Sequence, residues 1–242
     1  MIGATSNAAP PWPASIDGGG DRPADGGYDW REAVPEPSHA YLDPVVLRAL
    51  VDWQRRAASP RGRVRVFDAG CGNGALLRTL YGRHYDVAGC ELSSTGVALA
   101  RETLGSRVRI EQMSVYDDLA AVFGLGWDVV VATEVIEHLF APRLFVRRAL
   151  ALLAPGGALL LTTPYHGYLK NVALAVTGSL DRHFTALWDG GHIKFWSYAT
   201  LTALLREAGF GHFRFYGAGR IPGLWKSMVV LATVQPNVGE AA

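Results

Sequence analysis

Short apolar runs alternate with helix-like segments through most of this chain, and this alternation restricts the fold more than any other feature. Residues 128–133, for example, are apolar and rich in β-branched side chains, as a strand buried on both faces of a sheet should be. Strands that alternate with helices predict a parallel sheet covered by helices on both faces. Ligands of such sheets bind beyond the carboxyl ends of the strands. The side chains that follow the strands are therefore the candidates for function.

The hydrophobic pattern predicts an α/β domain preceded by a short helical region. Strands are expected at 64–68, 85–91, 107–112, 128–133, 158–163, 212–216 and 228–234. Helices are expected at 75–81, 95–104, 134–153 and 198–208, with a further helix opening at Asp43-Pro44, where Asp43 is the predicted N-cap. We expect a mobile Gly- and Pro-rich tail over 1–27, a cap region over 28–62 and the main domain over 63–242. The main domain contains an irregular, aromatic-rich insertion at about 164–196, which we interpret as a substrate lid.

Composition narrows the class of protein. Lys and Arg number 23 against 22 Asp and Glu, and this balance argues against a general nucleic-acid binder. The only two cysteines, Cys71 and Cys90, exclude a disulfide framework and a zinc-finger pattern. No apolar run reaches the roughly 18 residues that a membrane span needs, and no signal peptide is recognisable. We therefore expect a cytoplasmic protein without membrane insertion; its oligomeric state is left open, with a homodimer as one option.

A glycine-rich turn, Gly70-Cys71-Gly72-Asn73-Gly74, follows the first predicted strand and opens a helix. Glycines permit a tight turn and a close approach of ligand to backbone, and the helix start offers free N–H donors. The spacing Gly70-x-Gly72-x-x-Ala75 also satisfies the fingerprint of dinucleotide-binding proteins. Asp68 lies immediately before the turn, where its carboxylate would repel a diphosphate. It would attract an ammonium group, which favours an amino-acid-like ligand.

Carboxylates also follow the second and third predicted strands. Glu91, about 20 residues beyond the glycine turn, can accept hydrogen bonds from two ribose hydroxyls. Nucleotide cofactors and S-adenosylmethionine both carry such a ribose, so Glu91 alone does not distinguish them. Leu92 can pack on an adenine face, and Asp117 with Tyr116 can contact the adenine amino group. Helix capping by Asp117 is an equally good interpretation.

Taken together, residues 67–74, Glu91, Asp117 and 133–139 resemble the motifs of class I S-adenosylmethionine-dependent methyltransferases. Within that superfamily the chain is most similar to the ubiquinone-pathway O-methyltransferases and their small-molecule relatives, over about residues 39–235. The resemblance implies a seven-stranded sheet of order 3-2-1-4-5-7-6 with the last strand antiparallel, and an N-terminal cap that includes 39–42. It implies S-adenosylmethionine as cofactor and S-adenosylhomocysteine as product, contacted by Asp68, Gly70, Cys71, Gly72, Asn73, Gly74, Glu91, Leu92, Tyr116, Asp117 and Thr133.

Glu134, Glu137 and His138 follow the fourth strand at a spacing that places them on one face of the predicted helix. Two carboxylates and an imidazole can bind a divalent cation such as Mg²⁺ when a fourth ligand joins them. The resemblance suggests His192 as that ligand, since similar clusters bind metal in small-RNA 3′-terminal methyltransferases; His166 competes for the position. Alternatively, the acids favour the helix start through its dipole, and His138 is a metal-free general base.

The predicted reaction is methyl transfer to a hydroxyl oxygen of a natural-product or quinone-like small molecule. His138, His192 and Glu134 are the candidate catalytic residues, because a neutral hydroxyl needs a base or a metal to become a good nucleophile. The aromatic residues of 164–196 favour a flat or apolar acceptor. The alternatives are an RNA ribose 2′-O-methyltransferase that uses the metal cluster, a C- or N-methyltransferase, a nicotinamide-dependent oxidoreductase and a non-catalytic cofactor-binding protein.

Overall fold

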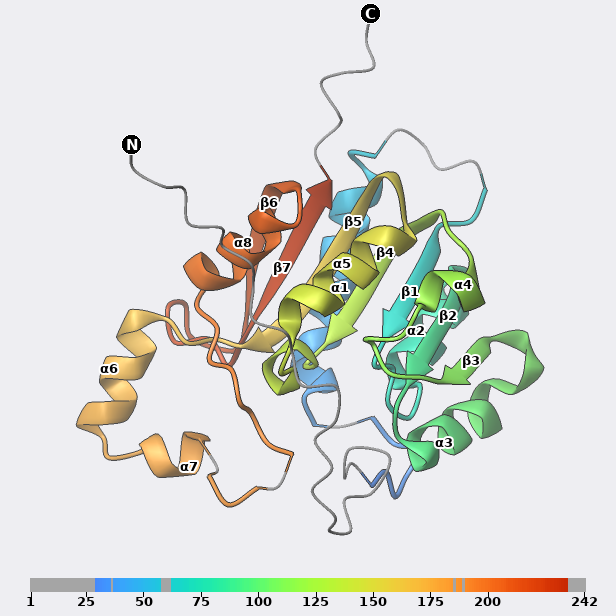
Figure 1. The fold of residues 1–242 in the computed structure, drawn as a ribbon. Coiled ribbons are helices and arrows are strands. Elements are labelled where there is room, and N and C mark those ends of the chain that lie inside the picture. The colour runs from blue at the N-terminus through green and yellow to red at the C-terminus, as the bar shows by residue number, and fades with distance from the viewer. Residues whose placement is uncertain (1–28, 36, 58–61, 185, 189, 235–242) are drawn as a thin grey trace, which may run out of the picture.

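A computed structural model of the chain describes residues 29–35, 37–57, 62–184, 186–188 and 190–234. Seven strands form one sheet in the order β3-β2-β1-β4-β5-β7-β6, and β7 runs antiparallel to both of its neighbours (Figure 1). The α/β fold and the strand order expected from the sequence are therefore confirmed. The tail predicted over residues 1–27 lies outside the described residues.

The strands fall close to their predicted positions, because short apolar runs between turn signals define them well. The buried central strand β4, for example, has Val129, Val130 and Val131 fully enclosed. The bounds of the strands are β1 Arg65–Ala69, β2 Asp86–Glu91, β3 Arg109–Gln112, β4 Trp127–Thr133, β5 Leu153–Pro164, β6 Phe210–Ala218 and β7 Ser227–Val234.

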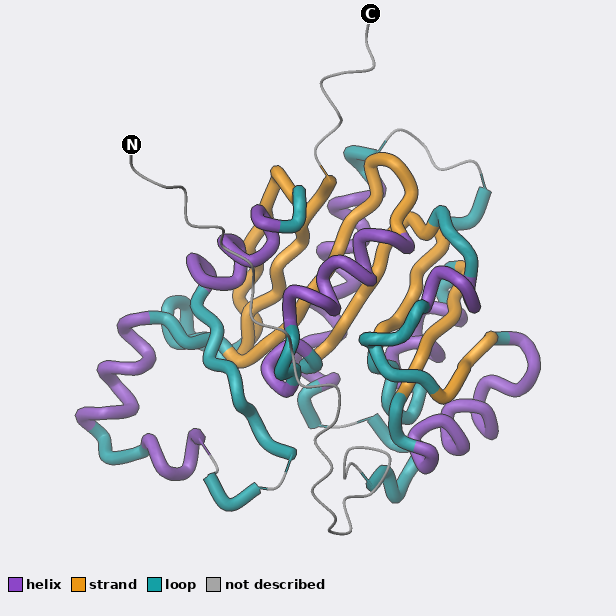
Figure 2. Tube along the Cα trace, in the orientation of Figure 1, coloured by secondary structure: helices purple, strands orange, loops and turns teal. Residues whose placement is uncertain are grey.

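Helices cover both faces of the sheet, which lies as a central layer between them (Figure 2). On one face α1 His39–Gln54, α2 Ala75–Gly82 and α3 Ser94–Leu104 bury their apolar stripes in one core. On the other face α4 Leu119–Phe123, α5 Pro142–Leu152 and α8 Tyr198–Glu207 form a second core. A 3₁₀ turn, η1 Gly105–Arg107, joins α3 to β3. None of the described helices is long and apolar enough to cross a membrane.

Helix α1 begins at His39, one turn earlier than predicted, so Asp43 is not its N-cap. Asp43 instead pairs with His39, whose Nδ1 lies 2.8 Å from Asp43 Oδ1. Pro44 lies inside the helix, where it removes a single backbone hydrogen bond near the start. Leu42 extends the buried stripe of the helix by that extra turn.

The helix predicted over 134–153 is wrong in its first half. Glu134 has a left-handed backbone with φ of 53°, a 3₁₀ turn η2 spans Ile136–His138, and α5 begins only at Pro142. Proline favours the first helical position and disfavours a helical conformation of the residue before it, so Pro142 fixes the start of α5. Glu134, Glu137 and His138 therefore do not share one face of a regular helix.

The insertion at 164–196, predicted to be irregular, contains two helices, α6 Tyr168–Val176 and α7 Leu180–Phe184. Both extend from one end of the sheet (Figure 1). Helix α6 exposes Tyr168 and Val176 and buries Lys170, the reverse of the pattern that identifies a helix packed on a core. For this reason hydrophobic periodicity did not predict it.

Candidate active site

One cavity of about 520 Å³ opens at the carboxyl ends of β1, β2, β3 and β4, where the strand order reverses between β1 and β4. Most of the residues predicted to be functional line it. They are Gly70, Cys71, Gly72, Asn73, Glu91, Leu92, Tyr116, Thr133, Glu134, His138 and His192. Asp68, Gly74, Asp117 and Glu137 are not among its lining residues.

The turn between β1 and α2 is held rigidly by the backbone of the neighbouring strand. The N–H groups of Gly70 and Cys71 both donate to the carbonyl of Cys90, each at 2.9 Å. Gly70 has φ of 84°, and a Cβ atom there would lie 2.7 Å from Val135 Cγ2. Only glycine therefore fits at this position, as the sequence pattern indicated.

Asp68 is fully buried at the end of β1, and neither of its carboxylate oxygens has a hydrogen-bond partner among the described residues. Burial raises the pKa of Asp68 to about 7, and the nearby Glu91 carboxylate acts in the same direction. A buried carboxylate without a partner is costly unless a cation or a proton compensates it. The site therefore suits a ligand that brings a positive charge.

Glu91, at the end of β2, is already oriented by the backbone. Its Oε2 accepts from the N–H of Gly72 and its Oε1 accepts from the N–H of Ser93, both at 2.8 Å. Each carboxylate oxygen can accept more than one hydrogen bond, so this arrangement leaves capacity for ribose hydroxyls. Leu92 lies beside it with 40% of its surface exposed, and lines the cavity.

Beyond β3, the cavity wall is formed by residues 113–116 and not by Asp117. The exposed Asp117 carboxylate accepts from the N–H of Ser114 at 2.9 Å and so shapes this wall from outside. Asp118, rather than Asp117, caps α4 by accepting from the N–H of Ala121. Contact of Asp117 with adenine remains a prediction.

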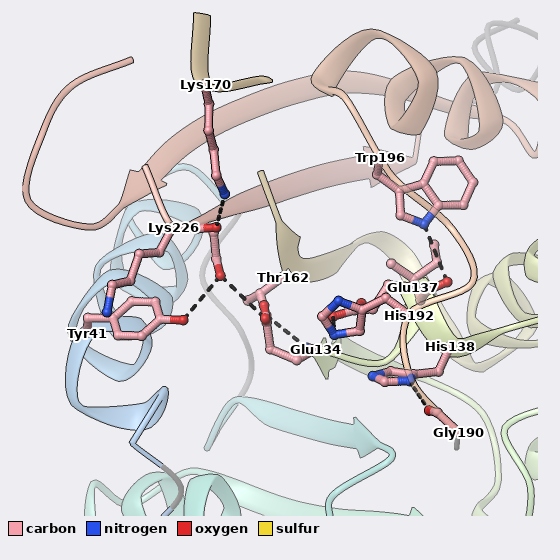
Figure 3. A network of polar contacts seen from close by, with 12 residues as sticks. Tyr41, Glu134, Glu137, His138, Thr162, Lys170, Gly190, His192, Trp196 and Lys226 are labelled. Carbon is pink, nitrogen blue, oxygen red and sulfur yellow. Dashed lines mark hydrogen bonds and ion pairs between the residues drawn. The ribbon is translucent and has the colours of Figure 1, made fainter. Parts of the chain in front are cut away.

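Glu134 is fixed by side chains from β5 and β7 (Figure 3). Thr162 Oγ1 donates to Glu134 Oε1 at 2.8 Å and accepts from the Glu134 N–H at 2.9 Å. Ser227 Oγ donates to Glu134 Oε2 at 3.3 Å. Burial raises the pKa of Glu134 to about 7, although these two hydroxyl groups oppose the shift. Sequence reasoning missed Thr162 and Ser227, since no local motif links them to Glu134.

A second polar cluster joins Glu137, His138 and His192, and each residue has a ligand atom within 4.8 Å of those of the other two. Glu137 is fully buried, its carboxylate oxygens have no hydrogen-bond partner among the described residues, and its Oε1 lies 3.9 Å from His192 Nε2. Burial and the neighbouring Glu134 carboxylate raise the pKa of Glu137 well above its usual range. The structure thus brings together three of the four predicted metal ligands; Glu134 and the alternative His166 are outside this cluster.

Residues 190–196 reach the cluster because their backbone pairs with the η2 turn. The N–H groups of Ile193 and Lys194 donate to the Glu137 carbonyl at 2.9 and 3.0 Å. His138 Nδ1 lies 2.8 Å from the carbonyl oxygen of Gly190 (Figure 3). Since a carbonyl can only accept, Nδ1 carries the proton and Nε2 of the neutral ring keeps a lone pair.

A profile of the methyltransferase domain matches residues 39–211 of the chain. The ubiquinone biosynthesis O-methyltransferase of Azorhizobium caulinodans is 32% identical over 190 residues, which cover 72% of each protein. This chain belongs to the class I S-adenosylmethionine-dependent methyltransferases.

Other relatives of this methyltransferase match over shorter segments. The ubiquinone biosynthesis O-methyltransferase of Chelativorans sp. is 32% identical over 125 residues, which cover 51% of this chain and only 49% of that protein. The chain therefore spans about half the length of that relative, and family membership alone does not identify its acceptor.

Solved structures share the fold of this methyltransferase. An O-methyltransferase family protein from Burkholderia thailandensis superposes with a TM-score of 0.61 and 20% identity, over 83% of this chain and 57% of that one. The magnesium protoporphyrin IX methyltransferase of Synechocystis, solved with bound S-adenosylhomocysteine, has a TM-score of 0.57 and 19% identity, over 82% and 84% of the two chains.

The methyltransferase cavity fits S-adenosylmethionine at one end. The preoriented carboxylate of Glu91, which lines the cavity, suits the ribose. The orphaned carboxylate of Asp68, which lies behind the lining, has the charge that suits the ammonium group of the methionine moiety. His39 and Asp43, which sequence analysis assigned only to the cap and to a helix N-cap, also line this cavity. A positive charge on His39 lowers the pKa of Asp68 and of Glu134, and so acts against the effect of burial on both carboxyl groups.

The other end of the methyltransferase cavity fits a divalent cation. Burial lowers the pKa of His138, and burial together with His138 lowers the pKa of His192 to about 4. Both rings are therefore neutral at pH 7, the form that ligates metals. With the orphaned carboxylate of Glu137 they offer one oxygen and two nitrogen ligands.

Proposed function

We propose that this protein transfers a methyl group from S-adenosylmethionine to a hydroxyl oxygen of a small, flat acceptor of the natural-product or quinone-like type. The observation that carries the proposal is the division of one cavity into two ends. Glu91 and the glycine turn line one end, and the neutral imidazoles of His138 and His192 line the other. The O-methyltransferase names of relatives that match over 72–74% of their length support a hydroxyl acceptor.

Aromatic side chains at the mouth of the acceptor end favour a flat, apolar molecule. Phe140 and Trp188 line the cavity with 72% and 43% of their surfaces exposed. The indole of Trp188 packs edge-on against both His138 and His192, at ring-centroid distances of 5.7 and 5.6 Å. A ring inserted here would lie beside the two imidazoles.

In the proposed reaction some residues align the cofactor with the acceptor, and others accept the proton of the acceptor hydroxyl. S-adenosylmethionine, when bound, supplies a methyl group activated by its sulfonium. Asp68 binds the ammonium group and Glu91 orients the ribose, which fixes the methyl carbon relative to the acceptor. His138, through Nε2, or His192 accepts the hydroxyl proton, since both rings are neutral at pH 7.

A divalent cation offers an alternative to a free base: the imidazole lone pairs would then ligate the cation instead of accepting the proton, and the cation would strengthen the acidity of the acceptor hydroxyl and orient it. Glu137, His138 and His192 would hold it. Glu134 stays hydrogen-bonded to Thr162 and Ser227, so its expected role is to shape the electrostatic field of the site from beside the cluster.

Two measurements test the proposal. Calorimetry should detect binding of S-adenosylhomocysteine and no binding of NAD; failure to bind either the donor or its demethylated product would refute the methyltransferase assignment. Candidate phenols, catechols and hydroxylated quinones should then be screened with isotope-labelled S-adenosylmethionine, and mass spectrometry should locate the label on oxygen. Label found on carbon or nitrogen would replace the O-methyl assignment.

Methylation of an RNA ribose is the second candidate, because a carboxylate–imidazole cluster could activate a 2′-hydroxyl in the same way. The formal charge of +1 counts against it, since nucleic-acid binding relies on basic side chains. Tight binding of a short RNA that weakens steeply with added salt would favour this candidate over the small-molecule acceptor.

A further inference from the structure

The segment just before α1 crosses the glycine turn and is tied to it by hydrogen bonds. Asn73 Nδ2 donates to the carbonyls of Glu32 and Val34, at 3.0 and 2.9 Å. Arg78 donates to the carbonyl of Ala33, and the Trp30 N–H donates to Thr95 Oγ1 at 2.9 Å. We refer to residues 29–35 as the strap. It is anchored at the amino-terminal ends of both α2 and α3.

Two glycines, Gly72 in the turn after β1 and Gly96 in α3, make room for the indole of Trp30. A Cβ atom on Gly72 would lie 2.5 Å from Trp30 Cζ2, and one on Gly96 would lie 2.9 Å from Trp30 Cδ1. Gly72 needs glycine in any case, because its φ is 53°. Gly96 lies inside α3, where alanine is the better helix former. Space for the indole therefore gives a reason for glycine at position 96.

The indole of Trp30 and the side chain of Glu91 approach the same point beside Gly96. The same Cβ position on Gly96 would be 3.1 Å from Glu91 Cγ, so Trp30 and Glu91 flank one point of the cavity wall. Trp30 and Glu91 both line the cavity. Gly72 is next to both of them: its N–H donates to Glu91, and its Cα lies against the indole of Trp30. Trp30 is thus placed at the adenosine end of the cavity, away from His138 and His192.

We propose that Trp30 is a cofactor-binding residue: its indole forms the outer wall over the adenosine moiety held at Glu91, and the strap keeps it there. An aromatic face over a ribose or adenine excludes water and adds apolar contact area. This inference rests on the proposed use of S-adenosylmethionine and extends it to a residue outside the motifs that identify the family. Because changes at one binding site act mostly on the dissociation rate, loss of the indole should mainly speed dissociation.

The test compares S-adenosylhomocysteine binding to the wild-type protein, Trp30→Ala and Trp30→Phe by calorimetry and stopped-flow. We expect affinity to fall about 10-fold or more in Trp30→Ala through faster dissociation, and less than 3-fold in Trp30→Phe, which keeps an aromatic face. Tyr168→Ala, which removes an exposed aromatic ring of α6, is the matched control and should bind normally. Thermal melting checks that each variant folds.

A double-mutant cycle distinguishes direct contact of the Trp30 indole with the cofactor from a purely structural role of Trp30. Gly96→Ala should weaken binding in the wild-type background, since its Cβ displaces the indole, and should weaken it much less in the Trp30→Ala background. Equal affinity and dissociation rate in wild type and Trp30→Ala would overturn the role of Trp30 while leaving the cofactor assignment intact. Failure of the wild-type protein to bind S-adenosylhomocysteine would overturn both.

Discussion

The two ends of the cavity are built in different ways. The cofactor end draws its central residues from one stretch of sequence, since Asp68, the glycine turn and Glu91 lie within 24 positions, and its turns are held by backbone hydrogen bonds. The acceptor end draws Glu134 to His138 from the segment between β4 and α5 and His192 from the segment before α8, with Ser227 from the start of β7 beside Glu134.

This difference shows at which end of the cavity the side chains are already held in position without a ligand. At the cofactor end Glu91 is fixed by two backbone N–H groups, whereas the Asp68 carboxylate has no hydrogen-bond partner among the described residues. At the acceptor end the fully buried Glu137 lacks such partners among the described residues and faces two neutral imidazoles. Under the proposed function, the first end needs compensation only at Asp68 and is otherwise preformed, whereas at the second end Glu137 would be compensated by a cation or a proton.

The largest expected effect is that of Asp68→Asn on cofactor binding. Removing one partner of a buried charge pair costs about 3–4 kcal/mol, so affinity for S-adenosylhomocysteine should fall several-hundred-fold by calorimetry. The variant should fold normally, because the carboxylate has no hydrogen-bond partner among the described residues. Asp86→Asn, an exposed residue at the start of β2, is the control and should bind as the wild type does. A normal affinity in Asp68→Asn would remove Asp68 from the cofactor end.

At the acceptor end, His192→Ala should lower kcat about 100-fold, the size typical of a lost general base or metal ligand. Affinity for S-adenosylhomocysteine should stay within 2-fold. If a cation takes part, a chelator should abolish turnover of the wild type and Mg²⁺ should restore it. His212→Ala, on the exposed side of β6, should keep full activity. Full turnover in chelator would leave the cluster only its base role; loss of cofactor affinity in His192→Ala would mean that the two ends are not separate.

The stability of the ligand-free protein should depend on pH through Asp68. Its folded pKa of about 7 lies above the usual 3.8, so the folded state keeps a proton that the unfolded state loses. The free energy of unfolding should therefore fall as pH rises from about 4 to 7, by up to about 1.4 kcal/mol per pH unit. Urea unfolding at pH 5 and pH 8 measures this. Asp68→Asn should flatten the dependence; the same slope in both proteins would assign it to other groups, such as Glu134.

The smallest expected effect is that of Phe140→Ala at the cavity mouth. Loss of a largely exposed aromatic contact should raise the KM for the acceptor about 3- to 5-fold and leave cofactor affinity unchanged. Leu125→Ala, an equally exposed apolar residue in the loop before β4, should change neither quantity. If Phe140→Ala instead weakens S-adenosylhomocysteine binding, the mouth belongs to the cofactor end.

Prediction from sequence succeeded where neighbouring residues decide the structure. The β4 strand, the turn at Gly70 and the strand-end position of Glu91 each depend on a few adjacent side chains. It failed at the start of α5, because the spacing of Glu134, Glu137 and His138 suggested a helix there, whereas α5 begins only at Pro142. It also failed at α6, whose apolar residues face outward while Lys170 is buried.

The sequence by itself determined the α/β sheet, the glycine turn and the acids at the strand ends, because strand, turn and charge signals act between residues close in the chain. Only the tertiary structure decided that His192 joins Glu137 and His138, that Glu134 is held by Thr162 and Ser227, and that Trp30 lies on Gly72 and Gly96. These contacts join distant segments whose meeting depends on the path of the whole chain. The raised pKa values follow from the same cause, since burial exists only once the fold has closed around each group.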